Sequence, residues 1–256
     1  MMYENIFDTH AHYDDERFEE DRDEFLSSLP SLGVINVINC GCDLESSRKS
    51  IDLCNKFDYF YCAVGIHPSN ITDNSYDELN EIKKLYSYEK CVAIGEIGLE
   101  YHYDFIPKDI QLDIFEKQLI LSKELDLPVI VHDREAHEDT MTLLKKYQPK
   151  GVVHCFSGSA EMAKEVLKLG MYIGLGGAVT FKNARKPLEV AEMLPPDRLL
   201  LETDCPYMTP VPFRGKRNSS DLIMYTAEKL AEIKGINAQE LITSTCQNAR
   251  VLFNII

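Results

Sequence analysis

The sequence predicts an α/β fold, a (β/α)₈ TIM barrel that forms one domain over residues 1–256, and three observations support that prediction. Short apolar runs rich in β-branched residues alternate with segments of helical periodicity about eight times, at intervals of roughly 25–30 residues. The length of 256 residues is ordinary for such a barrel. No interdomain linker or low-complexity run divides the sequence.

Eight strands are expected in chain order, and the segments between them carry helical signals. The expected strands are residues 4–12, 33–41, 60–68, 91–99, 128–134, 151–158, 171–177 and 197–204. Residues 109–126 illustrate the helices, because apolar side chains recur there at i, i+3 and i+4 spacing. A doubly wound sheet would usually need fewer strands, so the pattern favours a closed barrel.

Composition narrows the possible classes of function. The N-terminus has neither the basic nor the apolar region of a signal peptide, and no run approaches the ~18 apolar residues of a membrane span. The eight cysteines include one close pair, Cys40 and Cys42, without the spacing of a zinc or disulfide framework. We therefore expect a cytoplasmic protein with no membrane contact and no obligate protein partner. Its net charge of −15 opposes polyanions unless metal ions or a basic loop reverse the field locally.

Polar residues gather at the predicted C-terminal ends of the strands, where barrel enzymes carry their chemistry. The seventh strand end has no ionisable residue. The other ends offer, in chain order, His10, His12, Cys40, His67, Glu96, His132, His154 and Asp204. Five of the seven histidines in the chain therefore fall on one rim.

The first strand ends in a His-x-His pair. Because side chains alternate along a strand, His10 and His12 point to the same face, which at a barrel end is the interior. Two neutral imidazoles can bind one divalent cation, although a solvated or hydrogen-bonded pair is the simpler reading of this motif alone. Asp8 lies one layer deeper, so we expect it to support the pair or to fill a packing role.

Glu96 ends the fourth apolar run between two glycines, Gly95 and Gly98, which allow close approach of backbone or ligand. A carboxylate buried there needs a partner. The partner could be a rim Arg or Lys, but we favour a carboxylate that bridges two cations ~3.5–4 Å apart. Glu100 is expected to be a solvated charge in the loop.

His132 and His154 each end an apolar run. Taken singly, either could be a buried histidine bonded to a backbone carbonyl, but together with Glu96 they suggest further metal ligands. His137 is expected to be exposed on a helix, and His102 to lie in a loop without a partner.

Glu202 and Asp204 are two residues apart on the eighth predicted strand, so both should point into the barrel. Asp204, at the rim, suits a metal ligand or an acceptor for the proton of an attacking water. Glu202, one layer below, suits a partner that orients Asp204, or one that neutralises a buried basic residue.

Substrate contacts are expected from two loops. His67 precedes a proline, which favours extended backbone, and could donate to a phosphate or carbonyl oxygen. The stretch "PFRGKRN" is the compact basic patch near the rim, with Arg214, Lys216 and Arg217. It is either a solvated face or a loop that binds anions against the unfavourable net charge.

The chain as a whole resembles the TatD family of metal-dependent deoxyribonucleases, within the wider amidohydrolase-like barrels. The resemblance runs through "DTHAHYD", "AVGIHP", "IGEIGLEYH", "LPVIVHDREA", "HCFSGS", "IGLGG", "LLLETDCPYMTP", "FRGKRN" and "NARVLF". The family commonly has Asp followed by an aromatic pair where this chain has Glu100, Tyr101 and His102, which leaves the role of that loop open.

The resemblance implies a dinuclear site that holds two divalent metal ions, with Zn, Mn and Mg all suited to the ligands. One ion would be held by His10, His12, Glu96 and Asp204, and the other by Glu96, His132 and His154. Activated water would cleave phosphodiester bonds of DNA, as in an exonuclease, with Glu96, Asp204 and Glu202 as catalytic residues and with His67, Arg214 and Lys216 on the substrate.

Two other classes of function stay open at this stage. A small-molecule amidohydrolase or esterase of the same superfamily would commonly bridge its metals through a modified lysine at the fourth strand, where this chain has Glu96. A non-catalytic binding protein would have lost ligands, and none is missing from the set.

Overall fold

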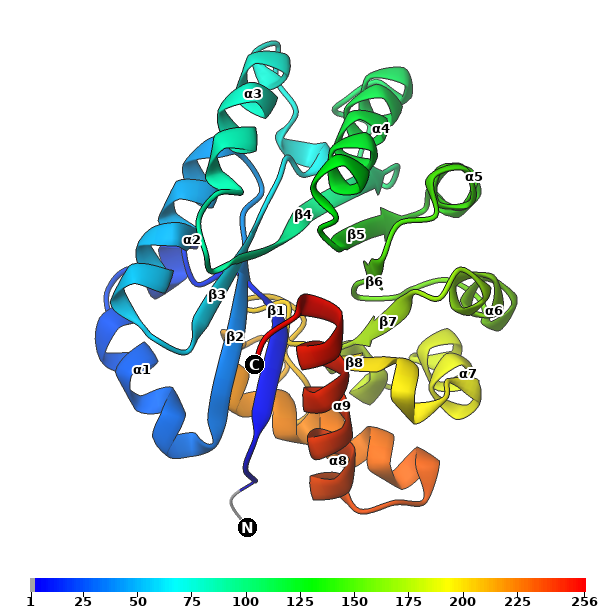
Figure 1. Cartoon of the computed structure of the whole chain (residues 1–256). Coiled ribbons are helices and arrows are strands. Elements are labelled where there is room, and N and C mark those ends of the chain that lie inside the picture. The colour runs from blue at the N-terminus through cyan, green and yellow to red at the C-terminus, as the bar shows by residue number, and fades with distance from the viewer. Residues whose placement is uncertain (1–2) are drawn as a thin grey trace.

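The computed structural model, which describes residues 3–256, is a (β/α)₈ barrel, and the predicted fold class is confirmed. Eight strands form one sheet in chain order, each parallel to the next, and the helices lie outside them (Figure 1). The strands are β1 (Ile6–Ala11), β2 (Val34–Cys40), β3 (Phe60–Val64), β4 (Cys91–Glu100), β5 (Val129–Arg134), β6 (Gly151–Val153), β7 (Tyr172–Leu175) and β8 (Leu199–Leu201).

Helices follow the strands along the chain. The α-helices are α1 (Arg22–Ser28), α2 (Leu44–Lys56), α3 (Ser75–Leu85), α4 (Lys108–Leu125), α5 (His137–Tyr147), α6 (Ala160–Lys168), α7 (Arg185–Met193), α8 (Ile223–Lys234) and α9 (Ala238–Phe253). Short 3₁₀ helices are η1 (Glu16–Phe18), η2 (Leu29–Leu32), η3 (Pro68–Asn70), η4 (Gly177–Thr180), η5 (Pro196–Arg198) and η6 (Ser220–Leu222). Across residues 3–256, no helix combines the length and the apolar character needed to cross a membrane.

Several strands are shorter than the sequence predicts. β3 ends at Val64, β6 at Val153 and β8 at Leu201, although the predicted runs continue to residues 68, 158 and 204. The apolar sequence pattern extends past the ends of these strands, because the chain stays buried after its backbone hydrogen bonds to the neighbouring strands end. His67, His154 and Asp204 therefore lie on loops that leave the rim, and not on the strands themselves.

The apolar interior has two layers. One cluster takes one or two residues from every strand, including Phe7, Ile38 and Leu200, and adds Ala249 and Phe253 of α9. This cluster fills the barrel, and α9 closes it from the N-terminal end of the strands, in front of the ring in Figure 1. The larger cluster packs the outward side chains of the strands against the surrounding helices.

The barrel closes between β8 and β1 through residues that follow β8. The amide of Asp204 donates to the carbonyl of His10 at 2.9 Å, and the amide of His12 donates to the carbonyl of Cys205 at 2.8 Å. Below them the Thr9 hydroxyl donates to the Leu201 carbonyl at 2.9 Å. The closing seam of the barrel thus carries three of the predicted site residues.

Gly98 allows β4 and β5 to approach each other beside the predicted site. Its φ of +147° is rare for residues with a side chain, and a Cβ there would lie 1.9 Å from the His132 carbonyl oxygen. Any side chain at this position must therefore strain the backbone and displace the strand that carries His132.

We predict that Gly98→Ala lowers the free energy of unfolding by roughly 2–4 kcal/mol, since backbone strain and overpacking add. Gly170→Ala is the control, because Gly170 also has a positive φ, +77°, but its Cβ would meet nothing within 4 Å. That variant should lose about 1–2 kcal/mol from strain alone. Urea denaturation of both variants measures the difference, and equal losses would show that the contact with β5 is unimportant.

Candidate metal centre

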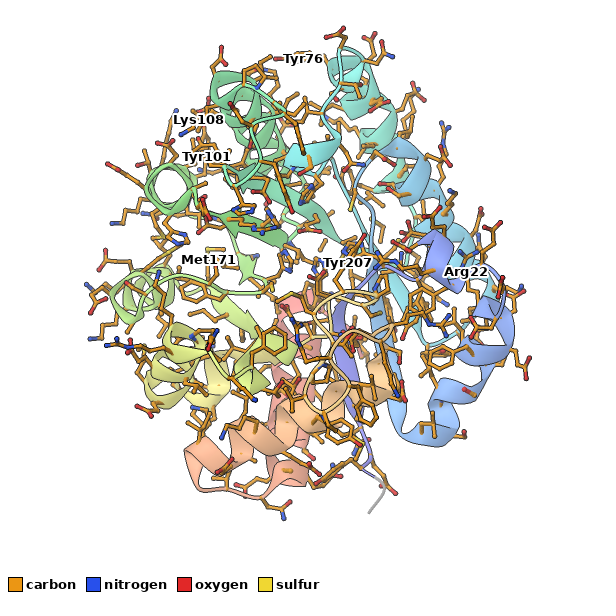
Figure 2. All side chains as sticks on the ribbon, turned by 180° about the vertical axis from the view of Figure 1, so that it is seen from behind. Arg22, Tyr76, Tyr101, Lys108, Met171 and Tyr207 are labelled. Atoms are coloured by element: carbon orange, nitrogen blue, oxygen red, sulfur yellow. The ribbon has the colours of Figure 1, made fainter. Side chains whose placement is uncertain are left out.

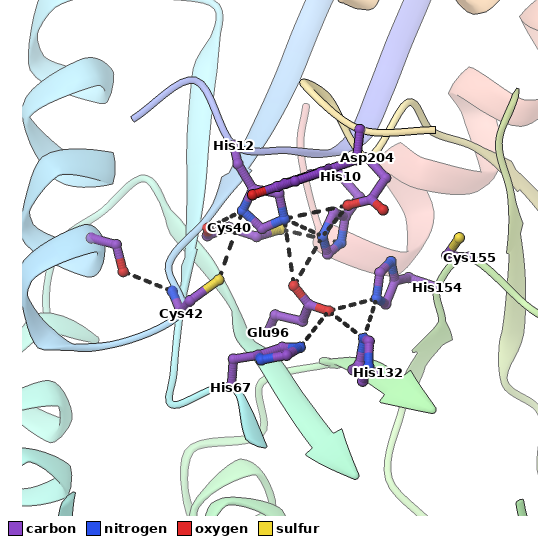
Figure 3. A network of polar contacts seen from close by, with 12 residues as sticks. His10, His12, Cys40, Cys42, His67, Glu96, His132, His154, Cys155 and Asp204 are labelled. Atoms are coloured by element: carbon purple, nitrogen blue, oxygen red, sulfur yellow. Dashed lines mark hydrogen bonds and ion pairs between the residues drawn. The ribbon is translucent and has the colours of Figure 1, made fainter. Parts of the chain in front are cut away.

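Five imidazoles and two carboxylates meet at the C-terminal end of the barrel (Figure 3). The structure brings together every metal ligand proposed from the sequence and adds His67 to the group. Three sets of ligand atoms lie within 4.8 Å of one another: His10, His12 and Glu96; His10, His154 and Asp204; and His67, Glu96 and His132.

The Glu96 carboxylate stands at the middle of the cluster, and its two oxygens face different imidazoles. Oε2 lies 3.3 Å from His10 Nε2 and 3.5 Å from His12 Nε2. Oε1 lies 2.8 Å from His132 Nδ1 and 2.7 Å from His154 Nε2. One buried carboxylate therefore lies between two pairs of nitrogen donors, which adjoin where His10 stacks on His154.

His10 and His12 converge with Asp204 on the Oε2 side. Their Nε2 atoms are 3.0 Å apart, and Asp204 Oδ1 lies 3.7 Å from the first and 3.4 Å from the second. The ring of His10 also stacks on that of His154, with 3.9 Å between centroids. Several lone-pair atoms thus point at one small volume.

The second strand supports these histidines through Cys40, for which the sequence suggested a rim position but no role. The Cys40 carbonyl lies 2.9 Å from His12 Nδ1, and because a carbonyl can only accept, Nδ1 carries the hydrogen. The Nε2 lone pair of His12 is then directed to the cluster. The Cys40 thiol lies 3.5 Å from His10 Nδ1, and Cys42 Sγ lies 3.8 Å from His12 Nδ1.

The electrostatics of the cluster favour an ionised carboxylate and divide the imidazoles. Although burial lowers the pKa of His132, Glu100 and Glu96 outweigh it and raise that pKa to about 9, whereas the pKa of His10 falls. Burial alone would raise the pKa of Glu96, but the imidazoles of His154, His67 and His10 hold that pKa well below its usual range. Burial, together with His154, lowers the pKa of His10 to about 4. An anionic carboxylate beside neutral imidazoles is the form in which these groups bind a cation.

His67 lies closer to the cluster than a purely peripheral substrate contact would require. Its Nε2 is 3.5 Å from Glu96 Oε1, and its Nδ1 accepts the amide hydrogen of Ser69 at 3.1 Å. Because Nδ1 accepts, Nε2 carries the hydrogen and can donate toward the centre. This geometry fits the donor role that the sequence suggested, on the Oε1 side of Glu96.

Glu202 forms no hydrogen bond with the Asp204 side chain, so the structure offers no direct contact of that kind through which it would orient Asp204. One carboxylate oxygen accepts from the amide of Cys155 and lies 3.8 Å from His154 Nδ1. Strand alternation does not extend to these two residues, because β8 ends at Leu201 and Asp204 has a left-handed φ of +57°. Glu202 supports the His154 loop instead.

The surroundings of Glu202 are tight and incompletely paired. Its Oε2 and the Nδ1 of His154 are buried and have no hydrogen-bond partner among the described residues. Burial raises the pKa of Glu202 to about 8, although the nearby His154 opposes that rise. A Cβ at Gly174 would lie 2.2 Å from Oε2, so only glycine leaves room for this carboxyl group.

Glu100 is not the solvated charge that the sequence suggested. It is only 4% exposed, and its Oε2 lies 3.3 Å from His132 Nε2 and 3.8 Å from Arg134. Its Oε1 accepts the amide hydrogen of His102 at 2.7 Å. The last residue of β4 folds back onto His132, a contact that the loop composition alone gave no reason to expect.

Two further histidines were also misplaced by sequence reasoning. His102 was expected to have no partner, but its Nδ1 lies 2.8 Å from Glu135. His137 was expected to be exposed, yet it is half-buried at the first turn of α5 and lies 2.8 Å from Asp133. Neither imidazole belongs to the three sets of converging ligand atoms.

Asp8 fastens the barrel seam and does not contact the imidazoles. Its carboxylate accepts from the amide and the hydroxyl of Thr203, from the hydroxyl of Ser220 and from the His10 amide. Burial raises the pKa of Asp8 to about 6, and these four donors oppose the rise. Asp8 thus supports the site as the sequence suggested, by holding the backbone that carries His10 and Asp204.

The basic loop separates into paired and unpaired cations. Arg217 forms two hydrogen bonds with Asp21, at 2.6 and 2.7 Å, so its guanidinium is already paired within the protein. Arg214 lies over the ring of Phe181, 3.8 Å from its centroid. Among the described residues, neither Arg214 nor Lys216 has a carboxylate within ion-pair distance, and both are exposed.

The donor set fits divalent metal ions. Imidazole nitrogen and carboxylate oxygen are ligands of zinc and of the other first-row divalent ions, and manganese and magnesium favour the oxygens. The convergence of two Nε2 atoms at 3.0 Å, beside an ionised carboxylate, leaves lone pairs that a cation would satisfy. The residues present are therefore suited to metal binding.

Comparison with known proteins shows the family to which the chain belongs. A sequence model described as TatD related DNase matches residues 7–254. The chain belongs to this family. It is 44% identical to YabD of Bacillus subtilis, named an uncharacterized metal-dependent hydrolase, over 98% of this chain and 99% of that one.

Other TatD relatives are similarly complete matches. The 3'-5' ssDNA/RNA exonuclease TatD of Erwinia tasmaniensis is 32% identical over 98% of this chain and 100% of its own length. The crystal structure of YjjV, a TatD homologue from Escherichia coli, covers 100% of both chains with a TM-score of 0.91 and 32% identity. The family resemblance found in the sequence is confirmed, and the chain is a metal-dependent hydrolase of the TatD family.

We predict that Glu96→Ala removes more bound metal than His102→Ala. The carboxylate of Glu96 faces both groups of imidazoles, whereas His102 is partly exposed and pairs only with Glu135. Elemental analysis of the purified variants measures metal per chain, and thermal unfolding checks that both are folded. Unchanged metal content in a folded Glu96→Ala protein would refute the bridging role.

Proposed function

We propose that this TatD-family protein hydrolyses phosphodiester bonds of DNA, as an exonuclease that depends on two divalent metal ions. One observation supports the proposal most strongly, which is that the two oxygens of Glu96 face different pairs of imidazole nitrogens. A carboxylate shared in this way suits a two-cation site for phosphoryl chemistry. The relative from Erwinia named as a 3'-5' ssDNA/RNA exonuclease supports the choice of substrate.

The proposed ligands divide between the two sides of Glu96. His10, His12 and Asp204 would hold one ion on the Oε2 side, and His132 and His154 the other on the Oε1 side. Divalent ions bound there supply Lewis-acid stabilisation of the phosphoryl group and make water acidic enough to react near neutral pH.

Asp204 is the proposed proton acceptor, because it can reach solvent and substrate. Its side chain is 18% exposed, whereas the Glu202 side chain is 1% exposed and faces His154. The surrounding imidazoles outweigh burial and lower the pKa of Asp204, which keeps it ionised and able to accept a proton. Glu202, which the sequence suggested as a catalytic residue, acts in this proposal by positioning His154.

Arg214, Lys216 and His67 are the proposed contacts to the substrate phosphate. The first two are cations without ion-pair partners among the described residues, so they can bind a phosphate without first breaking an ion pair. Local cations of this kind offset the net charge of −15 that would otherwise repel DNA. His67 would donate from Nε2 on the Oε1 side of Glu96.

The proposed function is tested by metal analysis followed by a substrate panel. The protein is stripped with a chelator, reloaded separately with Zn²⁺, Mn²⁺ or Mg²⁺, and incubated with end-labelled single-stranded DNA, duplex DNA and small amides and esters. Stepwise shortening of DNA from one end supports the proposal. Hydrolysis of an amide or carboxylic ester without any cleavage of DNA would instead favour a small-molecule amidohydrolase or esterase.

We predict that Asp204→Asn lowers kcat for DNA by roughly 10²–10⁴-fold, the usual effect of removing a general base. Glu202→Gln should cost about 10–100-fold, because it acts through the position of His154. Both kcat values are measured at saturating Mn²⁺, with metal occupancy determined on the same samples. A larger loss for Glu202→Gln with metal still bound would make Glu202 the proton acceptor and reverse the assignment.

We predict that the double variant Arg214→Gln, Lys216→Gln raises KM for DNA by about 10-fold or more, because charge-assisted hydrogen bonds to phosphate are lost. Its metal content should not change. The matched control is Lys123→Gln, Lys150→Gln, which removes the same charge at the end of α4 and just before β6, at the opposite end of the barrel. An equal rise in KM for both double variants would mean that only net charge matters.

A further inference from the structure

The loop between β4 and α4 exposes two aromatic rings beside the metal centre. Phe105 is 76% exposed and Tyr103 is 44% exposed, although large aromatic side chains usually bury most of their surface. The two rings are nearly parallel, with an interplanar angle of 5° and 5.4 Å between centroids. Because most of Phe105 is open to solvent, at least part of a ring face is free to stack on a further planar group.

A continuous set of contacts joins these rings to the metal centre. The Arg134 guanidinium lies 5.1 Å from the centroid of Tyr103 and 3.8 Å from Glu100. Glu100 in turn lies 3.3 Å from His132, whose other nitrogen is 2.8 Å from Glu96. This chain of contacts places the aromatic pair at the same end of the barrel as the converging imidazoles.

Two cationic side chains lie near the loop, which itself carries Asp104 between the two aromatic residues. Lys108, the first residue of α4, is exposed, and its Nζ lies 4.0 Å from the centroid of the Tyr101 ring. Figure 2 labels both residues. The Arg134 side chain is 45% exposed. Two stacked rings, with one cation at the end of β5 and one at the start of α4, match the bases and phosphates of a nucleic acid strand.

We propose that Tyr103 and Phe105 form a stacking platform for a base of single-stranded nucleic acid, with Arg134 and Lys108 near its phosphates. This inference rests on the proposed function, since it places the base beside the phosphodiester bond to be cleaved. Every base has a π-face, so the platform tolerates any sequence. In a duplex both faces of an internal base are covered by its neighbours, so the platform selects single strands or frayed ends.

The platform is tested by binding, independently of cleavage. Short single strands of DNA and of RNA with hydrolysis-resistant phosphorothioate linkages are titrated into metal-loaded protein, and fluorescence anisotropy gives Kd. An abasic strand of equal length and charge separates contacts to bases from contacts to the backbone. The variants are Phe105→Ala, Tyr103→Ala and Phe105→Trp, and Val251→Ala of α9 is the control because it shortens another exposed apolar side chain, 63% exposed.

We expect Phe105→Ala to weaken binding of base-containing strands by roughly 5- to 150-fold, the equivalent of losing one stacked base. Tyr103→Ala should weaken it in the same direction, whereas Phe105→Trp and Val251→Ala should bind as the unchanged protein does. Binding of the abasic strand should be the same in all of them. Similar losses for DNA and RNA would show that the base, which both contain, is what the platform binds.

The outcomes separate the platform from the proposed function. The platform is wrong if Phe105→Ala binds base-containing strands normally, if it loses equal affinity for the abasic strand, or if the unchanged protein binds no single strand at all. Base-dependent binding that needs Phe105, in a protein that cleaves no ordinary DNA, would sustain the platform and refute the nuclease. If Phe105→Ala cleaves DNA as the unchanged protein does, the platform is refuted and the nuclease is sustained.

Discussion

The buried carboxylate of Glu96 is the interaction on which the arrangement of this site depends. A charged carboxylate that is 3% exposed is costly unless it is compensated, and here five imidazoles surround it. Each oxygen has its own partners, so the carboxylate links the two histidines at the end of β1 with those at the ends of β5 and β6. Buried positive charge is what this environment favours, which agrees with the metal dependence of the TatD family.

Folding and site assembly are coupled at the seam of the barrel. The backbone hydrogen bonds that join β1 to the segment after β8 are made by His10, His12 and Asp204, whose side chains belong to the site. Asp8 ties the same seam to Thr203 through buried hydrogen bonds. A change that opens the seam therefore separates the candidate ligands, because the same residues supply the closing backbone and the converging side chains.

The distribution of charge decides whether this acidic protein repels or attracts a phosphoester substrate. The net charge of −15 is unfavourable at long range, but screening limits that field to about 10 Å at moderate salt. At shorter range the exposed cations near the rim matter more, Arg214 and Lys216 after β8 and Lys108 and Arg134 near β4 and β5. Arg217, although close in sequence, is neutralised by Asp21.

The sequence by itself determined the barrel, its family and the residue types of the centre, because strand and helix periodicity and motif order are local properties. Strand alternation also places His132 correctly, two residues after Ile130 in the inner cluster. Alternation does not account for His10, because Phe7 belongs to the inner cluster and would send His10 outward. For Glu96 alternation gives no single answer, because Val92 and Ala93 both belong to the inner cluster. Shifts in register between Ile94 and Ile97, and between Asp8 and Ala11, turn the side chains of Glu96 and His10 inward. Such bulges arise from pairing with neighbouring strands. The contacts of Glu202 with the His154 loop and of Glu100 with His132 likewise depend on neighbouring strands, so only the tertiary structure decided them.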